Sequence, residues 1–276
     1  MTYQQYRPSQ FRILPPVVKN LLIINGLLYL ATVVLGSSLE FDITEKLGLY
    51  YFDSTFFKPY QFVTYMFVHG SFMHLFSNML ALWMFGNALE NAWGSKRFLI
   101  YYMITAIGAA LIQLLFTAYN FYSIHQAIAQ YLNAATVDGF TNIISTYFPL
   151  YIDSKPIQML INEWLHYPNN SVFISQSTQM LNELIELKKN IPTVGASGGV
   201  FAILLAFGML FPNNIIYLYF AIPIKAKYFV ILYGAWELFS GISNNPTDNV
   251  AHFAHLGGML FGFILIKYWQ KNTIIF

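Results

Sequence analysis

The chain has 276 residues, of which 57% are hydrophobic and 9% are charged, far below the roughly 25% of charged residues in ordinary soluble domains. A formal net charge of +2 is too small to indicate a nucleic-acid partner, and the lack of cysteine excludes disulfides, thiolate catalysis and zinc–thiolate sites. The composition therefore predicts an all-α polytopic membrane protein embedded in a lipid bilayer.

Apolar stretches of near-membrane length divide the chain. Residues 1–16 are polar and punctuated by proline, so we expect a cytoplasmic tail there and a membrane domain over residues 17–276. A helix rises about 1.5 Å per residue, so about 20 apolar residues cross the roughly 30 Å hydrocarbon core. This length predicts six helices, of which the fourth is short: 17–36, 62–91 or 72–91, 98–119, 197–211, 227–241 and 249–268.

A polar insertion over residues 120–192 separates the third and fourth predicted helices. It is rich in Asn, Ser, Gln and Tyr, and three of its stretches have the apolar spacing of surface helices. These stretches cover residues 124–135, 157–166 and 178–189. With the N-terminus inside, the insertion is extracytoplasmic.

The distribution of basic residues favours that orientation. With six helices and the N-terminus in the cytoplasm, nine Lys and Arg residues fall in cytoplasmic segments and five in exterior ones. Cytoplasmic segments of membrane proteins carry an excess of Lys and Arg. We therefore expect both termini to be cytoplasmic and the second, fourth and sixth helices to begin at the outer face.

Ser197 stands at the start of the fourth predicted helix in the stretch Val-Gly-Ala-Ser-Gly-Gly-Val, residues 194–200. Small residues let membrane helices pack closely, so the serine could be a packing residue. A serine between glycines can also present its hydroxyl to a group that comes close. Ser197 is therefore a candidate nucleophile.

Histidines gather at the same depth as Ser197. Four of the six lie near the starts of the second and sixth predicted helices, which begin at the same face as the fourth: His69, His74, His252 and His255. Ionisable groups at membrane depth are costly and usually mark function. A single histidine there could simply bind a carbonyl, and the four together could form a metal site in a transporter. No H-E-x-x-H pattern supports the metal alternative.

Helical spacing gives these residues candidate roles. His74 and Asn78 are four apart, so both can donate hydrogen bonds to one oxyanion. His255, Gly258 and Gly262 form a stripe that allows the sixth helix to approach the glycines beside Ser197, as a serine–imidazole hydrogen bond requires.

Spacing alone does not decide which histidine is the base. His252 lies one turn before His255 on nearly the same stripe. Spacing also places neither nearby acid, Glu237 or Asp248, against either imidazole. A two-residue Ser–His dyad is the simplest hypothesis.

Three motifs, in this order, resemble the rhomboid family of intramembrane serine proteases over about residues 17–120 and 193–270. They are His69-x4-His74-x3-Asn78, Gly195-Ala196-Ser197-Gly198, and Ala254-His255-Leu256-Gly257-Gly258 with Gly262. The stretch from Leu89-Glu90 to Trp93-Gly94 is similar to the family's turn after the second helix, where a structural role for Glu90 is expected.

The resemblance implies a six-transmembrane-helix rhomboid-like bundle with Ser197 as nucleophile and His255 as general base and later acid. It implies that the oxyanion is held by the Ser197 backbone N–H, His74 and Asn78. The resemblance gives the remaining positions supporting roles, with His69 a structural residue: His69, Gly195, Gly198, Gly258 and Phe201. Relatives often have Tyr where this chain has Phe201, so the ring under the imidazole is kept and the hydroxyl is lost.

The expected function is hydrolysis of peptide bonds in or near transmembrane segments of membrane protein substrates, without a metal or cofactor. The resemblance suggests a bacterial-type, multi-pass protein of the inner (cell) membrane. The alternative is a proteolytically inactive rhomboid-like protein that binds or escorts membrane segments. The presence of both Ser197 and His255 favours the protease.

Overall fold

The computed structural model describes residues 12–39, 41–168, 170–218, 221–243 and 250–272, and they are mostly helical. Most of the predicted tail at 1–16 therefore lies outside the described residues. Asp248 lies outside them as well. The helices and strands are α1 (Pro16–Leu39), α2 (Ile43–Leu47), α3 (Gln61–Thr64), η1 (Tyr65–Phe67), α4 (Phe72–Ala81), the π-helical turn η2 (Leu82–Gly86), α5 (Asn87–Trp93), α6 (Ser95–Asn133), α7 (Val137–Tyr147), η3 (Pro149–Tyr151), α8 (Lys155–His166), α9 (Val172–Lys189), α10 (Ser197–Leu210), β1 (Ile215–Leu218), β2 (Ile222–Lys225), α11 (Ala226–Ser243) and α12 (His252–Asn272).

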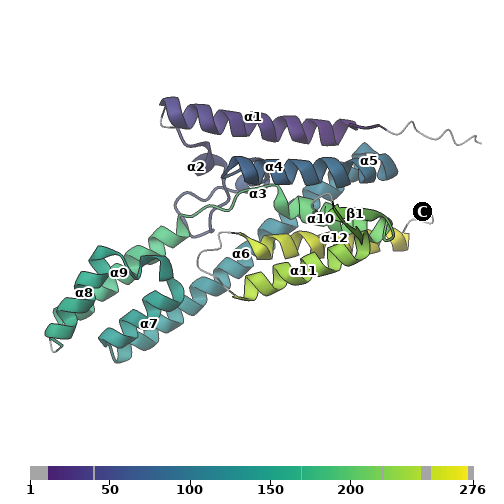
Figure 1. The fold of residues 1–276 in the computed structure, drawn as a ribbon. Helices are drawn as coiled ribbons and strands as arrows, with labels where there is room; N and C mark the ends of the chain where they lie inside the picture. Colours follow the sequence, from purple (N-terminus) through teal and green to yellow (C-terminus); the bar gives the residue numbers. More distant parts are fainter. Residues whose placement is uncertain (1–11, 40, 169, 219–220, 244–249, 273–276) are drawn as a thin grey trace, which may run out of the picture.

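Helix α10 is the centre of the bundle. It contacts α12, α6, α11 and the continuous segment α4–η2–α5, while α1 packs on the outer side of α4 (Figure 1). Its 14 residues span only about 21 Å, and most of them are buried. A helix too short to face lipid over the full hydrocarbon thickness is thus surrounded by protein instead.

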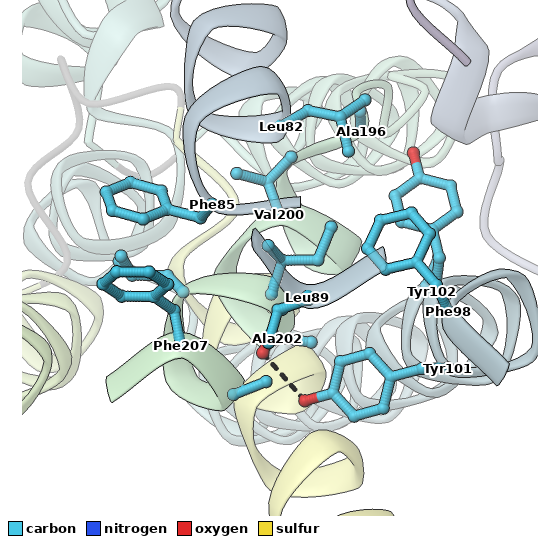
Figure 2. Packing of buried hydrophobic residues seen from close by; sticks show 14 of the residues in the cluster. Leu82, Phe85, Leu89, Phe98, Tyr101, Tyr102, Ala196, Val200, Ala202 and Phe207 are labelled. Carbon is cyan, nitrogen blue, oxygen red and sulfur yellow. Dashed lines mark hydrogen bonds between the residues drawn. The ribbon is translucent and has the colours of Figure 1, made fainter. Parts of the chain in front are cut away.

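Aromatic side chains from α6 form one wall of the core around α10. Phe98, Tyr101 and Tyr102 are fully buried against residues of α10 and of the α4–α5 segment (Figure 2). The Tyr101 hydroxyl donates a 2.8 Å hydrogen bond to the carbonyl of Ala202, drawn as a dashed line in Figure 2. The polar end of this ring is therefore satisfied although it lies in the interior.

The start of α1 is held by a buried carboxylate. Glu90 in α5 is 2% exposed and accepts hydrogen bonds from the backbone N–H groups of Val17 (3.0 Å) and Val18 (2.8 Å). The hydroxyl of Ser95 donates to the same side chain at 2.6 Å. The first N–H groups of a helix have no partner within the helix, so Glu90 supplies the missing acceptor. Its negative charge also interacts favourably with the positive end of the helix dipole. This is the structural role expected for Glu90.

Two described helices are long and apolar enough by themselves to cross a bilayer, α1 over Pro16–Ser37 and α6 over Ser95–Asn133. Helix α10 is a shorter apolar helix of the same kind. Every predicted membrane stretch is largely helical in the structure. The number of spans and the side on which the termini lie stay predictions.

Helix α6 is longer than the sequence predicted. A break was expected at Tyr119, but the helix continues to Asn133 and its last turns form a second core with α7, α8 and α9 beyond the end of the main bundle (Figure 1). The insertion prediction gave the approximate places of α8 and α9 and missed α7. The polar residues after Tyr119 therefore belong to a part of the helix that packs within this second unit, and they do not mark a helix end.

A short hairpin joins α10 to α11. Strands β1 and β2 are antiparallel, with Ile215 opposite Lys225 and Leu218 opposite Ile222. The backbone N–H of Ala226 then donates to the Asn214 carbonyl at 2.8 Å, which turns the chain into α11. The hairpin lies at the end of α10 opposite Ser197 (Figure 1).

Replacing Glu90 tests the contribution of its carboxylate. Glu90→Ala leaves two helix N–H groups and the Ser95 hydroxyl without their acceptor, and we expect a loss of about 1–3 kcal/mol of stability. Thermal unfolding of the detergent-solubilised protein measures this loss. Glu163→Ala, which removes an exposed glutamate from α8, is the matched control and should leave the melting temperature unchanged. Equal melting temperatures for the two variants would contradict the capping role.

Candidate active site

A turn at Gly195 places Ser197 at the first position of α10. Gly195 has φ +122°, a conformation that side chains other than glycine rarely adopt. A Cβ atom at this position would also lie 2.7 Å from Cε1 and Nε2 of the His74 ring. The loop before Ser197 can therefore pass His74 closely only because residue 195 is glycine.

Backbone hydrogen bonds fix this loop to the segment between α1 and α4. Leu49 and Thr193 exchange two backbone bonds of 2.9 and 2.8 Å, and the N–H of Gly195 donates to the Tyr65 carbonyl at 3.0 Å. Leu49 and Tyr65 are themselves buried. The position of Ser197 is thus set by a segment that lies more than 100 residues earlier in the sequence.

Ser197 and His255 lie within hydrogen-bond distance. The Ser197 Oγ is 2.8 Å from Nε2 of His255, which comes from the first turn of α12. His255 is 7% exposed, whereas Ser197 is half-buried. This is the distance at which an imidazole can take the proton of a serine hydroxyl.

Glycine pairs make this distance possible. A Cβ atom on Gly258 would overlap the backbone carbonyl of Gly198, so α12 and α10 touch backbone to backbone one turn beyond His255. Gly262 continues the contact one turn further, against Tyr101 and Ala202. The predicted approach of the sixth helix to Gly198 is present, whereas Gly199 faces Tyr102 of α6 instead.

The His255 ring rests on Phe201. The two rings stack with centroids 4.0 Å apart and 7° between their planes. Phe201 lies one turn after Ser197 on α10 and is itself buried. The stacking expected of a ring at this position is therefore made by phenylalanine, without a hydroxyl.

Glu237 of α11 contacts the other side of the imidazole. Its Oε2 atom is 2.8 Å from Nδ1 of His255 and 2.6 Å from Nδ1 of His252. All three residues are less than 10% exposed. The structure thus extends the predicted pair: Glu237, which sequence spacing did not place, lies against the imidazole of His255.

The remaining predicted residues, His69, His74 and Asn78, lie on α4 or just before it. The His74 ring borders Gly195, and Asn78, one turn along α4, donates through Nδ2 to the His74 carbonyl at 2.8 Å. An amide nitrogen has two N–H groups, so Asn78 keeps a second donor. His69 is buried, packs edge-on against the His74 ring with centroids 5.0 Å apart, and reaches the N–H of Ala196 only at 3.5 Å.

Glu237, His252 and His255 also form a group whose ligand atoms lie within 4.8 Å of one another, close enough for a metal ion. However, the oxygen–nitrogen separations of 2.6 and 2.8 Å are hydrogen-bond lengths. Ligands of a tetrahedral zinc ion, at about 2.0–2.1 Å from the metal, lie about 3.3 Å apart. The arrangement therefore fits a shared proton acceptor better than a metal centre.

Comparisons with known proteins agree with the motifs. The Rhomboid domain family matches residues 57–167 and 164–271, which together are most of the chain. The chain belongs to the rhomboid family. A curated relative, Rhomboid-like protein 11, chloroplastic, of Arabidopsis thaliana, is 31% identical over 102 residues, which are 36% of this chain and 36% of the plant protein. As a rhomboid family member with apolar helices, the protein is an integral membrane protein.

One sequence signal could have singled out Glu237 in this rhomboid. It is an ionisable residue inside an apolar stretch of membrane length, between Trp236 and Leu238. Such residues usually face the bundle interior and have a partner there. The signal predicts burial, but the partner becomes visible only once the packing of α11 against α12 is known.

The contact between Gly198 and Gly258 can be tested by adding one methyl group. Gly258→Ala forces α10 and α12 apart, and we expect a loss of about 1–3 kcal/mol, as for other overpacked cores. Thermal unfolding in detergent measures it. Gly26→Ala in α1 is the matched control, because no atom lies within 4 Å of the added Cβ there. If Gly258→Ala is as stable as Gly26→Ala, the close contact is not required.

Proposed function

We propose that this rhomboid is a serine endopeptidase that cleaves peptide bonds in or near transmembrane segments of other membrane proteins. The observation that carries the proposal is the 2.8 Å separation of the Ser197 hydroxyl and Nε2 of His255 in a buried site. The half-buried state of Ser197 supports access of a substrate from one side. No metal or cofactor takes part.

In the proposed reaction, Ser197 Oγ attacks the scissile carbonyl while Nε2 of His255 takes the hydroxyl proton. The same proton is then given to the leaving amine, which leaves an acyl-enzyme. A water molecule, deprotonated by His255, hydrolyses the ester and restores Ser197. Phe201 holds the imidazole ring in its plane throughout, because the two rings are stacked.

The negative charge of the tetrahedral intermediate is held by the backbone N–H of Ser197, the ring of His74 and the free amide N–H of Asn78. His74 borders the loop before Ser197, and Asn78 lies one turn away on the same helix face. Donors aimed at the developing charge stabilise the transition state more than the substrate. His69 supports this group through its contact with His74.

The proposed setting is a bacterial cell membrane, crossed six times with both termini in the cytoplasm. The excess of Lys and Arg in the segments assigned to the cytoplasm supports this orientation. Ser197 then lies near the outer face, on the same side as the unit formed by α7, α8 and α9. Substrates are transmembrane proteins that reach Ser197 from the bilayer.

A serine-directed probe tests the nucleophile. A fluorophosphonate forms a bond between Ser197 Oγ and phosphorus and releases fluoride, so wild-type protein in detergent should be labelled and Ser197→Ala should not. His255→Ala should be labelled much more slowly, because no base takes the hydroxyl proton. Ser123→Ala, which removes a half-buried serine of α6, is the control and should be labelled like wild type.

The same assay separates the alternatives. Unlabelled wild-type protein that still binds transmembrane peptides would indicate an inactive family member and contradict the protease. Labelling that is lost with a chelator would indicate a metal-dependent site. Cleavage of a transmembrane peptide by wild type but not by Ser197→Ala is the result that the proposal requires.

The oxyanion donors are tested by their effect on the turnover number. His74→Ala and Asn78→Ala should each lower kcat by about 10²–10³-fold, the usual cost of losing one such donor. KM should change little, because the interaction forms in the transition state. Met73→Ala, which removes an exposed neighbour on α4, is the control. A change in KM alone would contradict an oxyanion role.

A further inference from the structure

We infer that Glu237 is a positioning residue for His255: its carboxylate fixes the orientation and the tautomer of the imidazole that takes the proton of Ser197, and His252 holds the carboxylate in place. This inference rests on the proposed protease function and extends the predicted Ser–His pair to a chain of four side chains. Its evidence is the cluster at the contact of α11 and α12.

The burial of Glu237 is unusual for its helix. Of the 18 residues of α11, only Ala226, Val230 and Glu237 are buried. Most large apolar side chains of the helix are exposed on the outer surface of the bundle, among them Trp236 and Leu238 on either side of Glu237. The carboxylate is thus turned into the protein while its apolar neighbours face outward. An unpaired charge in this position would be costly.

The hydrogen-bond pattern selects one tautomer of His255. An ionised carboxylate only accepts hydrogen bonds, so the nitrogen 2.8 Å from Glu237 Oε2 must carry a proton. In the neutral ring the proton is then on Nδ1, and Nε2 has its lone pair directed at Ser197 Oγ, 2.8 Å away. Only this tautomer can accept the serine proton. Without the carboxylate the ring divides between both tautomers.

The carboxylate also stabilises the charged form of the base. When His255 takes the serine proton it becomes an imidazolium, and the opposite charge of Glu237 lies in direct contact with it. Electrostatic attraction is stronger in a buried site than in water. The proton on Nδ1 stays on Nδ1, as in the aspartate-containing triads of serine proteases, and is not passed to Glu237.

His252 acts one step further away. Its Nδ1 donates to the same Oε2 atom at 2.6 Å, so the buried oxygen receives two N–H groups. The two imidazoles lie nearly perpendicular, with centroids 6.3 Å apart, and both contact the carboxylate of Glu237. His252 therefore positions Glu237 rather than the reacting atoms, and its removal should have a smaller effect than removal of Glu237.

A purely structural role is the competing explanation, since Glu237 could serve only to attach α11 to α12. Kinetics separate the two. In Glu237→Gln the shape is kept and the charge is lost, and kcat for a transmembrane peptide should fall by about 10²–10⁴-fold with KM unchanged; the upper figure is the loss for the corresponding change in a serine-protease triad. Glu237→Asp, which keeps the carboxylate, should restore part of this loss. The kcat of His252→Ala should lie between the kcat values of wild type and Glu237→Gln.

Glu90→Gln is the matched control, because Glu90 is also a buried, hydrogen-bonded glutamate but lies away from Ser197. It should lower the melting temperature without changing kcat of the folded protein. If Glu237→Gln behaves like Glu90→Gln, with reduced stability and an unchanged kcat, the role of Glu237 is structural and the inference is wrong.

The tautomer is measured independently of activity. Nitrogen NMR of ¹⁵N-histidine-labelled protein, with His255 assigned by comparison with His255→Ala, should show a protonated Nδ1 in wild type and a mixture of tautomers in Glu237→Ala. An unchanged tautomer would overturn the inference. If wild-type protein neither cleaves peptides nor reacts with the fluorophosphonate, the protease proposal fails, whereas the NMR result still decides how Glu237 acts on His255.

Discussion

The structure depends on the backbone contact between Gly198 of α10 and Gly258 of α12. Packed helices usually lie 8–10 Å apart, a distance set by the side chains between them. Gly258 has no side chain to hold its helix away from the Gly198 carbonyl, so the serine at the start of α10 can reach the imidazole at the start of α12. The aromatic residues of α6 pack against α10, and the turn at Gly195 sets where the helix begins. The contact between Ser197 and His255 thus depends on residues that have no reactive groups.

Two buried glutamates of this protein have specific hydrogen-bond partners, and the partners differ in kind. Within the described residues, Glu90 and Glu237 are the carboxylates with less than 9% exposure. Glu90 accepts hydrogen bonds from backbone N–H groups and a hydroxyl, which fixes where α1 begins. Glu237 instead contacts two imidazoles, which fixes how those rings are turned. The same side chain in similar burial therefore caps a helix in one place and holds two imidazoles in the other.

The sequence predicted the places of the main helices and the residues that meet around Ser197, because helical spacing and a common membrane depth bring Ser197, His255 and Gly258 into one layer. It did not predict the position of Glu237. Helix α11 is apolar on nearly every side, so its pattern has no polar face from which its rotation can be read. The continuation of α6 beyond Tyr119 was missed for a related reason: polar residues in a helix that leaves the membrane resemble those of a loop.

The unbroken length of α6 has a mechanical consequence. Its 39 residues extend about 58 Å, nearly twice the roughly 30 Å of hydrocarbon, so one crossing of the bilayer needs only about half of the helix. The unit of α7, α8 and α9 is built on the last turns of this helix and is joined to the loop after α1 by the ion pair of Lys189 with Asp53 and the hydrogen bond of Ser54 with Asn190. A continuous helix with these two contacts at its side restricts rotation of the unit relative to the bundle more than a flexible linker would. The unit is therefore joined to the bundle by a continuous helix and by these side contacts, and not by a flexible linker alone.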